Sequence, residues 1–468
     1  MPAVQPRTPR TTAALRMPTR QEIADVARLA GPIVVVQVGL MLMGVVDTAM
    51  VGHVDATALA GVALGNLYWL LVVMLGMGTL MALDPVVAQA AGAKDDVAIA
   101  RGLQRGLLLS VAISVLSSIA LLPGEALFGL LRQPVEVQPI AVSYAHVNAW
   151  GTLPFFVFIV LRQTLQAFSR IRPIVWAVII GNVANTILDW LLVFGKFGAP
   201  QMGAIGSAYA SLISRWIMCL ALAWLGAGIL RPYLQELRRD TFDTGALYRL
   251  LVLGVPIGVH QWIEVTAFSA GLVLVGWMGT TAVAGHQIAI TLAALTYMVP
   301  LGVSAAAAVL VGHAIGREDP EGARREAGAA IVCGAGFMST TAIVLLTCAG
   351  FLSRSFTSDP SVIAVAITLI PIAGVFQVFD GIQGVSSGIL RGSGDTHVPA
   401  ILNFLGYSVG LSLGAWLAFT QEMGPRGVWW GLVAGLAAVA LALGWRVHHR
   451  LGGELQRIVI DRPVHTAN

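Results

Sequence analysis

Apolar runs of membrane-spanning length constrain this chain more than any other feature of its sequence. A helix needs about 20 apolar residues to cross a bilayer. Charged residues, about 25% of a soluble domain, make up only 11% of this chain. We therefore predict an all-α membrane protein with about 12 transmembrane helices. The runs lie near residues 30–53, 58–84, 103–123, 139–164, 173–195, 203–229, 248–276, 282–312, 327–351, 361–390, 398–420 and 427–445.

The distribution of Lys and Arg predicts the orientation of these helices. With the N-terminus placed inside, the inner loops carry fourteen Lys and Arg residues and the outer loops carry four. Because basic residues concentrate in cytoplasmic loops, we expect both termini in the cytoplasm, with residues 1–28 and 447–468 as cytosolic tails. Residues 1–28 lack the apolar core of a signal peptide. Short tails without an organelle signal favour a multi-pass protein of the bacterial cytoplasmic (inner) membrane.

The two halves of the chain repeat at a constant offset. Pro32 and Pro256 are 224 residues apart, within the similar segments AGPIVVVQ and GVPIGVHQ. Six predicted helices separate equivalent positions, so the two copies have the same orientation and form a parallel pseudo-twofold repeat. We expect an N-lobe of six helices over 29–230 and a C-lobe of six helices over 246–446. A charged cytoplasmic linker, 231–245, joins them.

Each predicted lobe carries carboxylates inside its apolar runs. An ionisable group at the bilayer centre costs about 2.5–3.5 kcal/mol on insertion scales, so such groups usually face a bundle interior or an aqueous cavity and mark ion pathways. Amide and carboxylate oxygens together suit Na⁺ or a shared proton. The alternative is that local amides satisfy these carboxylates and that they serve only helix packing. The candidates are Asp47, Asn182, Asn185 and Asp189 in the N-lobe, and Glu264, Asp380, Gln261 and Gln377 in the C-lobe.

Other polar and aromatic side chains are candidates for the wall of a substrate cleft. They are Gln37, Thr48, His260, Gln287, Phe376 and Gln383. A polar contact between helices explains Gln287 equally well, and a packed neutral histidine is the commoner explanation for His260. Arg215 either neutralises a buried carboxylate or extends to the membrane surface. Gly392-Ser393-Gly394 lacks the Lys-Ser/Thr of a phosphate-binding loop. No nucleophile–base triad or zinc motif occurs, so we expect no enzyme activity and no cofactor.

Several segments, in order along the chain, carry a family resemblance. They are GVVDT at 44–48, VVAQAAGA at 86–93, PIG at 256–258 and GILRG at 388–392. With them the chain resembles the multidrug and toxic compound extrusion (MATE) family, most closely its NorM-like branch. The resemblance implies antiport: cationic, amphipathic compounds leave the cell while H⁺ or Na⁺ enters. It also implies a cation site at Asp47, Asn185 and Asp189 in the N-lobe and another at Glu264 and Asp380 in the C-lobe.

The coupling ion and two alternative functions remain open. Phe376 lies where sodium-driven relatives are expected to carry tyrosine, and a phenyl ring offers no oxygen ligand, so H⁺ is favoured slightly over Na⁺. A flippase of lipid-linked precursors, from the same wider superfamily, should line its cavity with cations, whereas the membrane-embedded charge here is mainly acidic. A passive channel would not need a duplicated rocking architecture with a carboxylate cluster in each lobe, and a receptor usually carries an extramembrane domain, which we do not expect here. We expect a monomer that contacts membrane lipid and small organic cations, without a nucleic-acid partner.

Overall fold

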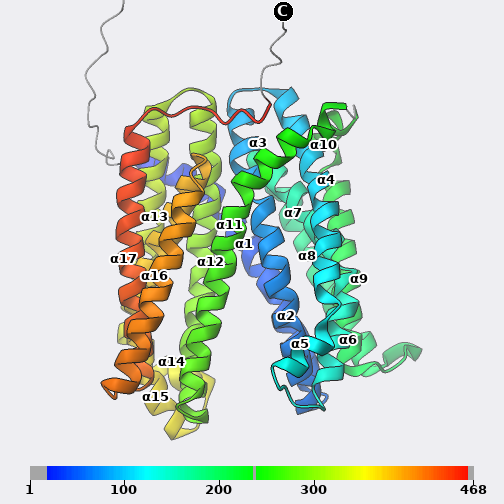
Figure 1. Ribbon diagram of the computed structural model, residues 1–468, viewed down its shortest axis with the longest axis vertical. Helices are drawn as coiled ribbons and strands as arrows, with labels where there is room; N and C mark the ends of the chain where they lie inside the picture. The colour runs from blue at the N-terminus through cyan, green and yellow to red at the C-terminus, as the bar shows by residue number, and fades with distance from the viewer. Residues whose placement is uncertain (1–17, 236–238, 462–468) are drawn as a thin grey trace, which may run out of the picture.

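The computed structural model describes residues 18–235 and 239–461, and this part of the chain is built from helices (Figure 1). Eleven helices are long and apolar enough to cross a membrane, or twelve if the bent pair α6–α7 counts as one span. The predicted all-α membrane fold is therefore confirmed. The helices are α1 (Arg20–Gly52), α2 (Ala56–Leu80), α3 (Leu83–Gly92), α4 (Asp96–Leu121), α5 (Gly124–Leu130), α6 (Gln138–Ala149), α7 (Thr152–Ala167), α8 (Arg172–Phe194), α9 (Gly203–Leu225), α10 (Ala227–Leu234), α11 (Thr244–Gly276), α12 (Thr280–Gly316), α13 (Pro320–Thr347), α14 (Ala349–Phe356), α15 (Pro360–Gly392), α16 (His397–Ala415) and α17 (Pro425–Gly452).

Helix ends differ from the predicted runs where polar residues extend a helix. α1 begins at Arg20, inside the segment expected to be a tail, because Thr19 and Glu22 form a capping box. The Thr19 side chain accepts a hydrogen bond from the Glu22 amide, and the Glu22 carboxylate accepts one from the Thr19 amide. α17 likewise runs to Gly452, beyond the expected end of the C-lobe. The predictions for residues 1–17, 236–238 and 462–468 lie outside the described residues.

One predicted span is broken. Between α6 and α7 the helix axis turns by 50°, at Trp150 and Gly151. Pro154 lies in the first turn of α7, where its missing N–H costs nothing. The break places Asn148, at the end of α6, next to α9, and this position matters for the polar site below.

Helices α1–α9 and α11–α17 form two groups that diverge toward one end of the molecule (Figure 1). We call these groups the N-lobe and the C-lobe. Between them α1 packs on α12, α2 on α11, and α3 on both α12 and α15. Glycines permit the approach: a Cβ added at Gly258 would lie 2.3 Å from the Leu75 carbonyl oxygen, and one at Gly316 would lie 2.1 Å from that of Gln89.

These interlobe contacts define what we call the closed end of the molecule. It is the end at which α3, α12 and α15 terminate and from which the described C-terminal segment leaves α17 (Figure 1). Side chains with carboxylate, amide and guanidinium groups are buried both there and within each lobe.

Candidate functional site

The N-lobe carboxylate predicted in α1 is buried and held by two other helices. Asp47 is 5% exposed. Asn185 Nδ2 of α8 donates to Asp47 Oδ1 at 2.9 Å, and Ser211 Oγ of α9 donates to Asp47 Oδ2 at 2.5 Å. α8 brings Asn185 and Asp189 to the same face because the two residues are one turn apart. The structure therefore brings together three of the four predicted N-lobe residues.

The oxygen atoms around Asp189 belong to carboxylate, amide and hydroxyl groups. Asp189 is fully buried and interacts electrostatically with Asp47. Asp189 also lies within hydrogen-bonding range of the Asp47 carboxylate and of the Ser207 hydroxyl, while Asn185 Oδ1 has no hydrogen-bond partner among the described residues. Two carboxylates this close together in a buried site repel each other unless a proton or a cation neutralises part of their charge. This donor set suits either a proton shared by the two carboxylates or an oxygen-ligated ion such as Na⁺.

Asn182, a candidate for the N-lobe cluster, forms its hydrogen bonds with backbone carbonyls and not with a carboxylate. Its Nδ2 donates to the Gly39 carbonyl of α1 at 2.9 Å and to the Val178 carbonyl of its own helix. One helical turn away from Asn185, it therefore faces the α1 backbone near Gly39 instead of Asp47. The hydrogen bonds of Asn182 join α8 to α1.

Arg215 of α9 is an internal cation of the N-lobe. It is 7% exposed, its Nη1 donates to Asn148 Oδ1 at 2.5 Å, and its guanidinium carbon lies 3.8 Å from the centroid of the Trp69 ring. Stacking on a tryptophan face stabilises a buried guanidinium. Arg215 also interacts electrostatically with Asp47 and Tyr144. The structure therefore supports the hypothesis that Arg215 lies near a buried carboxylate, and not the hypothesis that it extends to the membrane surface.

The two C-lobe carboxylates, Glu264 and Asp380, are close enough to interact electrostatically. Asp380 of α15 is buried, and its Oδ1 has no hydrogen-bond partner among the described residues. It interacts electrostatically with Glu264 of α11. Tyr297 of α12 and Tyr407 of α16 both interact with this carboxylate pair. The pair is thus surrounded by two phenol groups that can donate to a carboxylate.

Other predicted C-lobe residues point elsewhere. Gln377 donates to Thr296 Oγ1 of α12 and accepts from Thr341 Oγ1 of α13 at 3.1 Å, so its amide joins three helices. Gln261 is partly exposed on α11. Phe376, expected at the cleft wall, is 1% exposed and packs edge-to-face against Phe268 and Trp429. It belongs to the aromatic core of the C-lobe.

The remaining cleft candidates divide into buried and exposed residues. Gln383 Nε2 of α15 lies 3.2 Å from His260 Nε2 and donates to Asn403 Oδ1 at 2.8 Å, all three being buried. Thr48 and Gln287 are exposed, and the Thr48 hydroxyl donates to its own helix at the Gly44 carbonyl. His260 and Gln383 therefore form an interhelical network within the C-lobe.

Two arginines and one aspartate lie between the lobes near the closed end. Asp84 Oδ2 of α3 is 3.1 Å from Arg391 Nε of α15. Arg162 of α7 also interacts with Asp84 and donates to Gln37 Oε1 at 3.2 Å. Gln37 is thus tied to an arginine at the closed end. All three charged groups are buried.

Sequence reasoning missed the hydroxyl groups of both carboxylate clusters, among them Ser207, Ser211 and Tyr297. A signal was present in α9, where Ser207, Ser211 and Arg215 follow one another at four-residue spacing in an apolar helix. That spacing places them on one face. Tyr297 gives no such signal, because it depends on how α12 meets α11 and α15.

Comparisons with known proteins agree with this architecture. The MatE family profile matches residues 32–191 and 256–416, two segments whose starts are 224 residues apart. The chain is 34% identical to the "Multidrug resistance protein NorM" of Burkholderia vietnamiensis, over 93% of its own length and 96% of that protein. It is 37% identical to the "Probable multidrug resistance protein NorM" of Rhodopseudomonas palustris, over 92% of both. It is 35% identical to the "Multidrug resistance protein MdtK" of Pectobacterium atrosepticum, over 91% and 95%.

Solved structures share the fold. The "eukaryotic MATE transporter AtDTX14" superposes with a TM-score of 0.84 at 22% identity, over 91% of this chain and 95% of that one. A "multidrug resistance MATE family transporter of the MOP superfamily" gives a TM-score of 0.84 at 20% identity, over 93% and 97%. The names of these proteins refer to multidrug resistance and transport, and none of them is the name of an enzyme.

Proposed function

The chain belongs to the MatE family, and from that membership we propose that it is a multidrug exporter of a bacterial cytoplasmic membrane. It moves cationic, amphipathic compounds outward in exchange for inward H⁺ or Na⁺. The observation that carries the proposal is a pair of interacting carboxylates in each lobe, of which Asp47, Asp189 and Asp380 are buried. Groups of this kind inside a membrane bundle usually serve ion or substrate pathways.

The proposed exchange is a competition for buried negative charge. A cationic drug and an incoming cation both neutralise the carboxylates, because an unpaired buried charge is costly. Loading from outside changes the charge between Asp47 and Asp189, and so displaces the drug. A membrane potential contributes about 2.3 kcal/mol per charge for every 100 mV. H⁺ is slightly favoured as the coupling ion, since Phe376 offers no oxygen to a sodium ion.

Alternating access is the proposed route. The closed end, where α1 begins and α17 ends, is proposed to face the cytoplasm, because Lys and Arg concentrate in cytoplasmic loops. The described conformation then blocks the cytoplasmic side, and export requires the contacts between α1 and α12 and between α2 and α11 to separate. The parallel repeat of two lobes gives a physical basis for such rocking.

The test is ethidium transport in proteoliposomes, first under a pH gradient and then under a Na⁺ gradient. We expect wild type to move ethidium against its gradient. We expect gradient-driven transport to be lost in Asp47→Asn in the N-lobe, or in Glu264→Gln or Asp380→Asn in the C-lobe, or in variants of both lobes. Asp395→Asn is the matched control, because Asp395 pairs with Arg446 at 2.7 Å outside both clusters. No movement by folded wild type under either gradient would overturn the proposal in favour of a lipid-precursor flippase.

A further inference from the structure

The described chain continues past α17 as an extended segment that crosses the closed end (Figure 1). We call residues 453–461 the strap. It starts from the last helix of the C-lobe and reaches α3 and α4 of the N-lobe. The strap therefore connects the two groups of helices at the end where they already touch.

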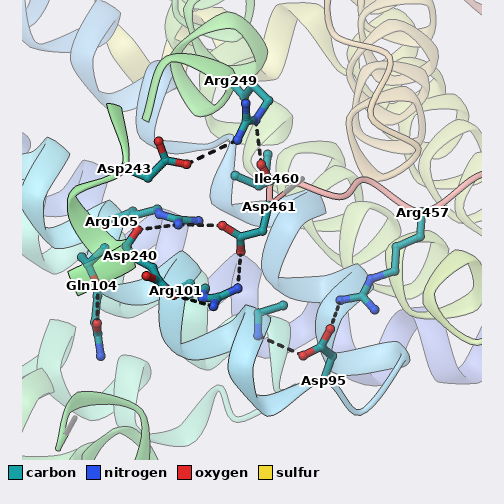
Figure 2. Close-up of polar contacts among 12 residues, drawn as sticks. Asp95, Arg101, Gln104, Arg105, Asp240, Asp243, Arg249, Arg457, Ile460 and Asp461 are labelled. Atoms are coloured by element: carbon teal, nitrogen blue, oxygen red, sulfur yellow. Dashed lines mark hydrogen bonds and ion pairs between the residues drawn. The ribbon is translucent and has the colours of Figure 1, made fainter. Parts of the chain in front are cut away.

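The distal anchor of the strap is the carboxylate of Asp461. Its Oδ1 lies 2.7 Å from Arg105 Nη2, and its Oδ2 lies 3.0 Å from Arg101 Nη1 (Figure 2). Both arginines belong to α4. The Arg105 side chain is 1% exposed, so its charge needs a partner inside the protein. Asp461, from the far end of the chain, supplies a carboxylate for that charge.

The same two arginines also hold the interlobe linker. Arg105 Nη2 donates to the Asp240 carbonyl at 2.7 Å, and Arg101 Nη2 donates to Asp240 Oδ2 at 2.8 Å (Figure 2). Arg249, in the first turns of α11, donates from Nε to the Ile460 carbonyl at 2.6 Å. Strap, linker and α4 thus share one set of polar contacts.

A second anchor lies three to four residues earlier in the strap. Arg457 Nη2 is 2.8 Å from Asp95 Oδ2, at the start of α4. The Ile458 amide donates to Gln89 Oε1 at 2.7 Å, while Gln89 Nε2 donates to the Gly392 carbonyl of α15 at 2.9 Å. Gln89 of α3 therefore binds the strap and the C-lobe together.

These contacts join parts of the molecule that must separate if the closed end opens. We propose that the strap is a releasable latch that favours the closed-end conformation and has to detach before the lobes part there. The inference rests on the proposed function, because it presumes alternating access. Exposed ion pairs bind weakly, and Asp95, Arg457 and Asp461 are all partly exposed. A latch built from them biases the equilibrium without locking it.

The experiment measures lobe separation at the closed end of the full chain in lipid nanodiscs. Spin labels are placed at Arg172→Cys in α8 and Glu321→Cys in α13, both exposed, after Cys219, Cys333 and Cys348 have been replaced by alanine. Pulsed electron paramagnetic resonance then gives the populations of short and long distances. We expect Asp461→Asn, and a chain ending at Gly453, to raise the ratio of long to short distances by about fivefold or more.

Asp395→Asn is the matched control, since it removes an ion pair of similar length that joins α17 only to its own lobe. Unchanged distances in both strap variants, or an equal shift in Asp395→Asn, would overturn the latch. Ethidium transport by the same preparations separates the two proposals. If wild type shows gradient-driven transport but the spin-label distances in both strap variants equal those of wild type, the latch alone is rejected. If wild type shows no transport, the proposed function is rejected.

Discussion

At the scale of single residues, the closed end buries two guanidinium groups around one carboxylate. Arg391 and Arg162 both interact with Asp84, and all three side chains are buried. Removing one partner of a buried ion pair costs about 3–5 kcal/mol, because the remaining charge is left uncompensated. We expect Asp84→Asn to lower the free energy of unfolding by about that amount, measured by denaturant unfolding in detergent micelles.

The second arginine provides the control for this prediction. Asp84→Asn combined with Arg391→Gln removes one positive charge along with the negative one, so part of the lost stability should return. If the double variant is no more stable than Asp84→Asn alone, the ion pair is not the source of the effect.

The carboxylates of both clusters stand out in the sequence, but most of the side chains that contact them do not. Asp47, Asp189, Glu264 and Asp380 are conspicuous because each is charged within an apolar run. Two asparagines of α8 lie about one helical turn apart, and only one of them contacts a carboxylate. Asn185 reaches Asp47, whereas Asn182 binds the α1 backbone. Such differences arise from the packing of α1 against α8, which a single-helix pattern does not contain.

At the scale of helices, glycines set how closely α16 and α17 approach. A Cβ added at Gly431 would lie 2.3 Å from the Gly414 Cα, while Gly444, on the same helix, has nothing within 4 Å of an added Cβ. Gly431→Ala must push the helices apart, at about 1–3 kcal/mol. Gly444→Ala should instead stabilise by up to about 1 kcal/mol, because alanine has the higher helix propensity.

Thermal unfolding in detergent distinguishes these two substitutions. The melting temperature should fall for Gly431→Ala and stay level or rise for Gly444→Ala. Equal changes in the two variants would mean that the close approach of α16 and α17 contributes nothing to stability.

The spans themselves were predictable because length and hydropathy determine them. All twelve predicted runs overlap helices or bent helix pairs of the structure. The 50° break at Trp150 and Gly151 was not predicted as two separate helices, although Pro154 next to it is a residue type that can kink a helix. The short helices α5, α10 and α14 were also missed, because their sequences merge with neighbouring spans or loops.

At the scale of the whole molecule, the lobes are joined by contacts between residues far apart in sequence. Asp461 and Arg105 are 356 residues apart, and no local pattern connects them. From the sequence, the basic residues of α4 indicated only which side of the membrane is cytoplasmic. In the structure, Arg101 and Arg105 also bind the strap and the linker.

The protonation of Asp461 decides how the strap responds to acid. Burial opposes its charge, but the hydrogen bond and charge of Arg105 and the charge of Arg101 outweigh burial and hold the pKa of Asp461 below its usual range. A pKa lowered in the attached state means that attachment is fully stabilised above the ordinary Asp pKa of about 3.9. The stabilisation is lost only as pH falls through the lowered value.

The strap should therefore be insensitive to pH across the physiological range and sensitive to salt. In the spin-label experiment, the difference between wild type and Asp461→Asn should stay constant from about pH 8 to pH 5. Raising the salt concentration from about 0.1 M to 1 M shortens the screening length from about 10 Å to 3 Å. Screening should weaken the partly exposed pairs and bring wild type toward the variant. A difference that shrinks between pH 8 and 6 at constant salt would show that another group, and not Asp461, controls the latch.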